Sequence, residues 1–209
     1  MSIYLFDFDG TLVDSMPIYG GVMLRILDEY HIPYPDTILK AITPLGLGGT
    51  AAYYVGMGLP RTKEQIVMQM TDYMVDAYTH RVPAKENVIE VLKALKARGD
   101  SLNVLTASPH VTLDACLMRL GIFDLFDHVW SCEDFGMTKS DTAIYHAAAR
   151  RLGVSVSDVI FLDDNYNADL TAKRAGMQVI GVYDDTSREY VQEIKSVTDR
   201  YIYNFKELL

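Results

Sequence analysis

Residues 3–15 have the sequence IYLFDFDGTLVDS. Residues 3–8 are apolar except for Asp7 and are rich in β-branched and aromatic side chains, which predicts a buried parallel strand. Asp9 and Gly10 then predict a turn. Asp7 and Asp9 are two residues apart, so a regular strand points both carboxylates to the same side. Because neighbouring carboxylates repel each other and require a cation, this segment is the first candidate functional site.

Four further strands are expected downstream of residue 84, and helical patterns separate them. The strands are predicted over residues 101–105, 127–131, 159–162 and 178–182, and the last helix over residues 188–197. Strands that alternate with helices predict an α/β fold, here a Rossmann-like parallel sheet with helices on both faces. Ligands of such sheets bind outside the carboxyl ends of the strands. Thr106, Asp163 and Asp164 all follow predicted strands and join the candidate site there.

Residues 15–82 lack a strand pattern and predict an all-helical insert. Helices are expected over residues 16–31, from a cap at Asp36 to residue 42, over 51–57, and from a capping box at Thr62 to about residue 80. Residues 43–50 (TPLGLGGT) contain three glycines and predict a loop. We therefore expect an α/β core of residues 1–14 and 83–209, with a small helical domain of residues 15–82 inserted after the first strand.

Composition restricts the classes of partner. The chain has 209 residues, a formal net charge of -9 and no cluster of Lys and Arg, so neither nucleic acid nor an anionic membrane surface is expected as a partner. Cys116 and Cys132 are too few and too far apart for a disulfide framework or a zinc site. The N-terminus lacks the basic region of a signal peptide, and no apolar run approaches the ~20 residues of a membrane span. We expect a cytoplasmic monomer or small homo-oligomer.

The segment DFDGTLVDS at residues 7–15 resembles the first motif of the haloacid dehalogenase (HAD) superfamily. The resemblance implies that Asp7 attacks phosphorus and forms an aspartyl-phosphate. It implies that Asp9 protonates the leaving oxygen and then deprotonates the water that hydrolyses the intermediate. Family members that cleave carbon–halogen or carbon–phosphorus bonds usually lack an aspartate at the position of Asp9, so its presence indicates phosphate-ester chemistry.

Residues 105–109 (LTASP) resemble the second motif of the family. Thr106 is then expected to hydrogen-bond the transferring phosphoryl oxygen, with backbone N–H groups near Ala107 as further donors. Ser108 is explained as the N-cap of the following helix, with Pro109 at the first helical position.

Lys139 resembles the lysine of the third motif, which implies that it screens the charges of the nucleophile and the phosphate. Related family members usually carry Lys-Pro here, whereas this chain has Lys139-Ser140, and Ser140 is a candidate N-cap.

Residues 161–169 (FLDDNYNAD) resemble the fourth motif, which implies a Mg²⁺ site. The ligands implied are the carboxylates of Asp7 and Asp164 and the backbone carbonyl of Asp9, with Asp163 as a further candidate. A phosphate oxygen and waters would complete the six oxygen ligands of the ion. Asp169 is expected to lie behind the metal ligands or to stabilise the loop, and direct ligation of the metal is the alternative. A metal-free alternative treats the aspartate pair as helix caps.

The position of the helical insert between the first two motifs resembles the cap domain of phosphoglycolate phosphatase and β-phosphoglucomutase relatives. Such a cap closes over the phosphate site, excludes water and reopens. Residues 43–50 resemble the substrate-specificity loop, where Gly46 and Gly48 permit close approach of a ligand to the backbone. A plain turn between helices remains the alternative for this segment.

The combined prediction is a Mg²⁺-dependent phosphatase that hydrolyses a small phosphorylated metabolite through an aspartyl-phosphate. A β-phosphoglucomutase-like mutase is the alternative, because it uses the same two aspartates. The phosphatase is favoured because residues 43–50 carry no Arg or Lys for a second phosphate. A non-catalytic binding protein on the same fold is a third hypothesis. It is disfavoured because Asp7, Asp9 and Lys139 are all present.

Overall fold

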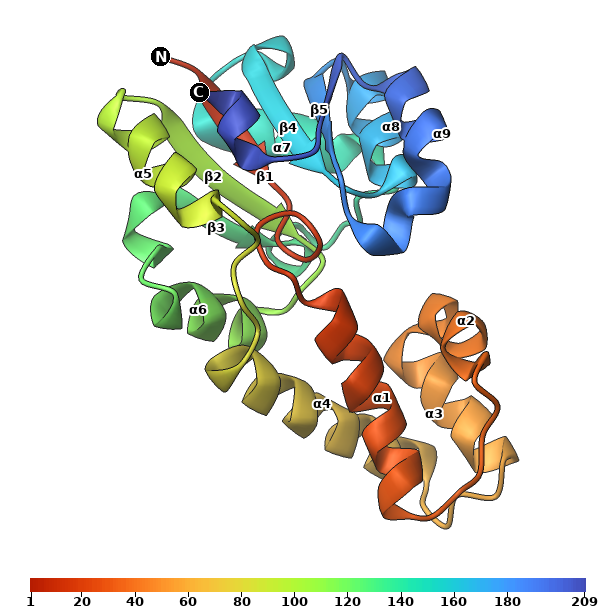
Figure 1. Cartoon of the computed structure of the whole chain (residues 1–209). Helices are drawn as coiled ribbons and strands as arrows, with labels where there is room; N and C mark the ends of the chain where they lie inside the picture. Colours follow the sequence, from red (N-terminus) through yellow and green to blue (C-terminus); the bar gives the residue numbers. More distant parts are fainter. The chain divides into compact units, whose positions relative to one another are not determined.

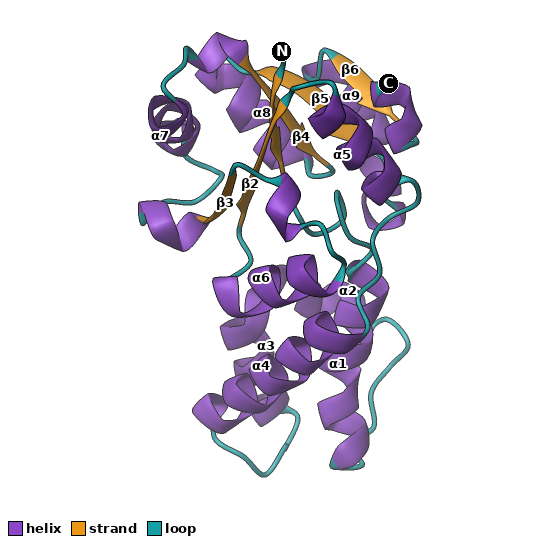
Figure 2. Ribbon diagram, turned by 90° about the vertical axis from the view of Figure 1, so that its left-hand side faces the viewer, coloured by secondary structure: helices purple, strands orange, loops and turns teal.

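The computed structural model describes residues 1–209 apart from the side chain of Pro44. The chain forms two compact units, Met1–Asp14 with Pro83–Leu209 (the core unit) and Ser15–Val82 (the helical unit). All strands belong to the core unit (Figure 2), and among the described residues of the helical unit none is in a strand.

The core unit is built on a six-stranded sheet in which every neighbouring pair is parallel, in the order β3-β2-β1-β4-β5-β6. The strands are β1 (Ile3–Phe6), β2 (Ser101–Thr106), β3 (His128–Ser131), β4 (Val159–Asp163), β5 (Gln178–Val182) and β6 (Arg200–Ile202). The predicted Rossmann-like parallel sheet is confirmed, although β6 was not predicted. The first strand is shorter than predicted, because it ends at Phe6. Its neighbours β2 and β4 place their carboxyl ends at the same edge as its own.

Helices cover both faces of the sheet (Figure 1). They are α5 (Val88–Ala97), α6 (His110–Arg119), α7 (Thr142–Leu152), α8 (Tyr166–Ala175) and α9 (Val191–Val197). On one face, Leu5 of β1 belongs to a buried cluster with side chains of α7 and α8. On the other face, the ring of Phe6 packs against Phe126 and Phe205 at centroid distances of 6.4 and 6.2 Å. Successive residues of β1 therefore anchor opposite layers, as a strand buried on both faces requires.

The helical unit consists of α1 (Met16–Glu29), α2 (Ile38–Ile42), a 3-10 turn (Thr43–Leu45), α3 (Gly46–Gly56) and α4 (Lys63–His80). Its core is apolar and includes Met23, Ile26 and Met70. The predicted capping box at Thr62 is present, because its side chain accepts the N–H of Gln65 and the Gln65 side chain accepts the N–H of Thr62.

Two predictions for the helical unit are wrong. The glycine-rich segment is not a loop: α3 begins at Gly46, whose φ of +61° suits glycine, and Gly48 and Gly49 are helical. A Cβ at Gly49 would lie 2.7 Å from Cβ of Leu45, the last residue of the 3-10 turn. This position therefore has no room for a side chain. Asp36 does not cap α2; Thr37 precedes that helix and makes no side-chain cap.

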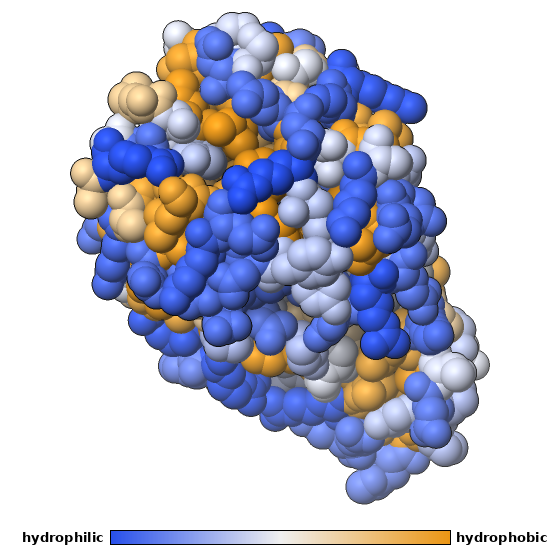
Figure 3. All heavy atoms as spheres, turned by 45° about the horizontal axis from the view of Figure 1, so that its top comes forward, coloured by the Kyte–Doolittle hydropathy of each residue, from blue (hydrophilic) through white to orange (hydrophobic). Residues whose placement is uncertain are grey.

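No helix among the described residues is long and apolar enough to cross a membrane. On the face drawn in Figure 3, hydrophilic side chains surround separate apolar patches.

Candidate active site

The carboxyl ends of three adjacent strands bring the predicted site residues to one edge of the sheet. Asp7 directly follows β1, and its N–H donates to the carbonyl of Leu162 in β4 at 2.8 Å. Thr106 ends β2 and Asp163 ends β4. All three polar side chains are buried, with exposed fractions of 6% or less. Burial of polar groups costs free energy unless they are paired, so their partners decide what the site can do.

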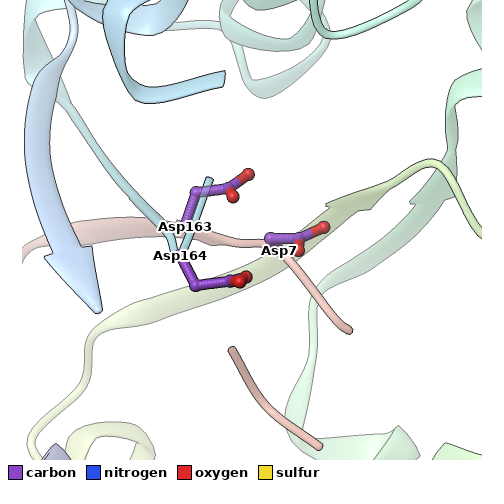
Figure 4. Close-up of side chains that lie close together, drawn as sticks. All are labelled: Asp7, Asp163 and Asp164. Atoms are coloured by element: carbon purple, nitrogen blue, oxygen red, sulfur yellow. The ribbon is translucent and has the colours of Figure 1, made fainter. Parts of the chain in front are cut away.

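Three carboxylates form a cluster at this edge. Asp7, Asp163 and Asp164 each offer an oxygen, and these oxygens lie within 4.8 Å of one another. Figure 4 shows the three side chains reaching toward the same side from the ends of β1 and β4. Burial, together with the charge of Asp163, raises the pKa of Asp7 to about 7 against the opposing effect of Lys139. Burial and the charges of Asp163 and Asp7 also raise the pKa of Asp164 well above its usual range.

Lys139 lies between two members of this cluster. Its Nζ donates to Oδ1 of Asp7 and, at 2.7 Å, to Oδ2 of Asp163. Burial acts to lower the pKa of this lysine, but the charges of Asp163 and Asp7 outweigh it and hold the pKa well above its usual value. Lys139 is therefore a partly buried cation that is fixed against the candidate nucleophile.

The loop that carries Lys139 is not held by the helix cap that was predicted. Ser140 is not the N-cap of α7; Asp141 is, and its side chain accepts the N–H of Ala143 at 2.9 Å. The hydroxyl of Tyr145 donates to the carbonyl of Lys139 at 3.0 Å. A tyrosine from the buried core thus fixes the loop at Lys139.

The first turn is shaped around Asp164. Gly10 has a φ of +74°, and a Cβ added there would lie 2.6 to 2.7 Å from the carboxylate of Asp164. The hydroxyl of Thr11 donates to Oδ1 of Asp164 at 3.3 Å. Only glycine lets the turn approach this carboxylate so closely.

The oxygens of the cluster suit a hard divalent cation such as Mg²⁺. Lys139 compensates Asp7 and Asp163, whereas its ammonium forms no ion pair with Asp164 among the described contacts. A cation beside Asp7 and Asp164 would offset the charge that remains, so the residues present fit the metal that the sequence predicts.

Lys85 is a partly buried cation that was not predicted from the sequence. Its Nζ donates to the carbonyls of Gly10 and Tyr183, both at 2.6 Å, and to Oδ2 of Asp184 at 3.0 Å. These bonds tie the turn of the first motif to the end of β5. Lys85 matches no motif, and the available signal was Asp184, a further carboxylate shortly after a predicted strand.

Ser108 is not a helix cap. α6 begins at His110, with Pro109 at the cap position and no side-chain cap. The hydroxyl of Ser108 instead donates to Oδ2 of Asp9, and the N–H of Ser108 donates to Oγ1 of Thr106 at 3.1 Å. The first and second motifs are therefore joined by a direct side-chain contact that the sequence analysis did not predict.

Asp169 was expected to lie behind the metal ligands or to stabilise the loop. It makes no hydrogen bond to the loop, and its place around the metal stays a prediction. It is fully buried in α8, and neither carboxylate oxygen has a hydrogen-bond partner. Burial, followed by the charges of Asp163 and Asp164, raises its pKa well above the usual range. The loop is instead held by Asn165, whose side chain accepts the N–H groups of Asn167 and Ala168.

Ala107, Gly46 and Gly48 are the remaining residues that were predicted to bind substrate. Ala107 is exposed beside Thr106 in the core unit. Gly46 and Gly48 belong to the helical unit, and the substrate contacts expected of them stay predictions.

A family model described as haloacid dehalogenase-like hydrolase matches residues 4–182. The chain belongs to this family. Among its relatives, pyrophosphatase PpaX of Bacillus velezensis is 30% identical over 85% of this chain and 81% of its own length. A phosphoglycolate phosphatase of Colwellia psychrerythraea is 27% identical over 99% of this chain and 95% of its own length.

The fold also matches solved structures of the family. The crystal structure of a putative β-phosphoglucomutase from Thermotoga maritima superposes with a TM-score of 0.85 at 21% identity, covering 100% of this chain and 97% of that one. A predicted phosphoglycolate phosphatase from Haemophilus somnus gives a TM-score of 0.84 at 22% identity, covering 100% and 96%. The family and the phosphatase relatives identify this HAD protein as a hydrolase of the phosphatase kind.

Proposed function

We propose that this HAD protein is a Mg²⁺-dependent phosphatase that hydrolyses a small phosphorylated metabolite through an aspartyl-phosphate on Asp7. The observation that carries the proposal is the arrangement of Lys139 across Asp7 and Asp163, beside Asp164. This arrangement holds a carboxylate at a strand end beside one ammonium and two further carboxylates. A nucleophile that must meet an anionic phosphate requires such compensation.

The proposed reaction has two steps. In the first, an oxygen of Asp7 attacks phosphorus, the bond to the ester oxygen breaks, and Asp9 gives its proton to that leaving oxygen. In the second, Asp9 takes a proton from water, whose oxygen attacks phosphorus and releases phosphate, which restores Asp7. The hydroxyl of Thr106 and the N–H of Ala107 donate to the phosphoryl oxygens, and Lys139 balances their charge.

The same cluster is proposed to hold the metal. The Asp7 and Asp164 carboxylates and the Asp9 carbonyl would hold it, with Asp163 as a further candidate ligand. When bound, Mg²⁺ supplies the positive charge that lets an anionic carboxylate and an anionic phosphate come together.

The substrate class follows from the relatives, whose names include phosphoglycolate phosphatase and pyrophosphatase. A small phosphorylated metabolite is therefore proposed. The helical unit is proposed to serve as a cap of the kind that the HAD resemblance implies, and a cytoplasmic location stays a prediction.

A mutase that returns the phosphoryl group to a sugar hydroxyl is the second candidate. One observation favours it: a Cβ added at Gly48 would lie 3.8 Å from Cε and 3.9 Å from Nζ of Lys63. A basic side chain from α4 thus stands beside the glycines of α3, although residues 43–50 contain none. Such a lysine is suited to a second phosphate group.

The test is phosphate release from a panel of phosphorylated metabolites, with Mg²⁺ or with EDTA, by the wild type and Asp7→Asn. Release that requires Mg²⁺ and is lost in Asp7→Asn supports the phosphatase. Isomerised sugar phosphate without free phosphate, followed by ³¹P NMR, would support the mutase. Neither reaction in folded protein would contradict both.

A further inference from the structure

The contact between Ser108 and Asp9 has no role in the reaction described so far. Ser108 follows β2 and Asp9 follows β1, so two neighbouring strands deliver the side chains to one place. The hydroxyl of Ser108 donates to Oδ2 of Asp9 across 99 positions in sequence. Both residues are partly buried, so the contact is shielded from solvent more than a surface hydrogen bond.

The local backbone directs Ser108 toward Asp9. The N–H of Ser108 donates to Oγ1 of Thr106, which folds the chain back over the end of β2. Pro109 then occupies the position before α6 with an extended ψ of 153° and, as a proline, has no N–H to offer. The hydroxyl of Ser108 makes no cap to this helix, so the turn leaves it directed at the carboxylate.

A hydroxyl donor in this place suits both protonation states of the aspartate. A carboxylate oxygen accepts the Ser108 hydrogen bond, and so does the carbonyl-type oxygen of a protonated carboxyl group. The bond to Oδ2 therefore survives the whole cycle, and it confines the transferable proton to Oδ1. An aspartate held by one oxygen also loses rotational freedom that it would otherwise have to lose on reaching the transition state.

We propose that Ser108 is a positioning residue for Asp9, which fixes Oδ2 so that Oδ1 alone exchanges protons with the leaving oxygen and with water. This inference rests on the proposed function, because it takes Asp9 as the acid and base of the reaction. It adds a residue from the second motif to the proton-transfer machinery. Thr106 of the same motif contacts phosphate in the proposed reaction, whereas Ser108 acts only through Asp9.

The test compares substrates whose leaving groups differ in their need for a proton. Glycerol 2-phosphate releases a strongly basic alkoxide unless Asp9 protonates it, whereas p-nitrophenyl phosphate releases a stable phenolate. In Ser108→Ala, kcat/KM for glycerol 2-phosphate is expected to fall about tenfold, a part of the whole effect of general acid catalysis. The value for p-nitrophenyl phosphate is expected to change much less. Ser108→Thr keeps the hydroxyl and is expected to restore the wild-type ratio of the two substrates.

Matched controls separate positioning from damage to the fold. Thr112→Ala removes a hydroxyl that donates to the Pro109 carbonyl at 3.0 Å at the start of the same helix, and its substrate ratio is expected to match the wild type. In an Asp9→Asn background, Ser108→Ala is expected to cause no further loss. If Ser108→Ala has a much lower melting temperature than the wild type, Ser108→Cys replaces it in the test. Cysteine is similar to serine in volume but is a weaker hydrogen-bond donor.

The outcomes distinguish this inference from the proposed function. Equal loss on both substrates, unchanged kinetics, or higher activity in Ser108→Ala would overturn the positioning role while Asp7→Asn stays inactive. Full activity of Asp7→Asn or Asp9→Asn would instead overturn the proposed reaction itself.

Discussion

The core unit and the helical unit bury different kinds of group. The core unit encloses Asp7, Asp163 and Asp169, and Asp169 has no hydrogen-bond partner for its carboxylate. The helical unit encloses mainly apolar side chains. Two of its buried hydroxyls donate to backbone carbonyls, Thr50 to Ile42 and Tyr54 to Met23, whereas the buried hydroxyl of Ser15 has no hydrogen-bond partner. Buried charge opposes folding, whereas a satisfied hydroxyl in an apolar core does not. Folding stability therefore explains most of the interior of the helical unit, whereas the acidic interior of the core unit requires a functional explanation.

This contrast predicts that substitutions in the two units separate activity from stability. Neutralising the acidic cluster should remove activity while the fold is kept or stabilised. Removing a buried group from the helical unit should lower stability and leave the chemistry intact.

The largest effect is expected for Asp7→Asn. Loss of the nucleophile should lower phosphate release by at least roughly a thousandfold. Because burial and Asp163 disfavour the charged form of Asp7, the variant should melt at or above the wild-type temperature at pH 8. Phosphate assays and thermal melts check both parts. If the variant is inactive because it is unfolded, Asp7 is required for stability, which would contradict the separation of activity from stability.

Asp164→Asn is expected to weaken binding of Mg²⁺ by at least about tenfold, because the site loses a charged oxygen ligand. Asp169→Asn is the matched control, since it neutralises a buried carboxylate of the same region outside the three-carboxylate cluster. Titration calorimetry with Mg²⁺ measures both variants directly. Equal weakening in the two would show that the total negative charge, and not ligation by Asp164, governs binding.

Lys85→Met tests the cation that ties the first turn to β5. Leaving the buried Asp184 without its partner should destabilise the protein by about 3 kcal/mol or more. Asp184→Asn in the same chain should recover part of this stability, because it removes the unpaired charge. Chemical denaturation gives the free energies of unfolding. Lys85→Met with wild-type stability would show that the ammonium contributes nothing to holding the turn.

Tyr54→Phe tests whether a buried group of the helical unit contributes to stability alone. Its hydroxyl donates to the carbonyl of Met23 at 2.9 Å in a fully buried setting. Loss of this bond should lower the free energy of unfolding by about 1 kcal/mol. The kcat for p-nitrophenyl phosphate should stay at the wild-type value, and a large fall in kcat would contradict the separation of roles.

The smallest effect concerns His110. Hydrogen bonds to Asp114 at 3.0 Å and to Asp134 at 2.9 Å raise the pKa of this histidine. A raised folded-state pKa stabilises the protein below the unfolded pKa, and this contribution disappears as the pH rises through the folded value. His110→Gln should therefore lower the melting temperature more at pH 6 than at pH 9. An equal difference at both pH values would show that protonation of His110 is not involved.

The sequence predicts the core unit well because burial restricts which residues its strands can contain. Strands buried on both faces must be continuously apolar, so a carboxylate such as Asp7 or Asp163 at a strand end stands out. The HAD motifs also occur in the order of the family along the chain, which supports the assignment of the site residues. β6 was missed because its three residues, Arg200–Ile202, give too short a pattern.

The contacts of Lys85 and Ser108 could not be predicted, because each depends on a partner about 100 positions away in the chain. The turn at residues 43–50 was predicted wrongly for another reason. Glycine is common in loops and also serves wherever a side chain lacks room, as at Gly49 against Leu45. Composition alone does not separate these two uses.

Trapping the phosphoryl group on Asp7 is the most decisive test of the proposed reaction. Enzyme and a cleaved substrate are mixed with Mg²⁺, quenched in acid within one turnover, digested and mapped by mass spectrometry. We expect a phosphorylated peptide containing Asp7 in the wild type and none in Asp7→Asn. Phosphate release without any phosphorylated peptide, or a phosphoryl group on another residue, would contradict it.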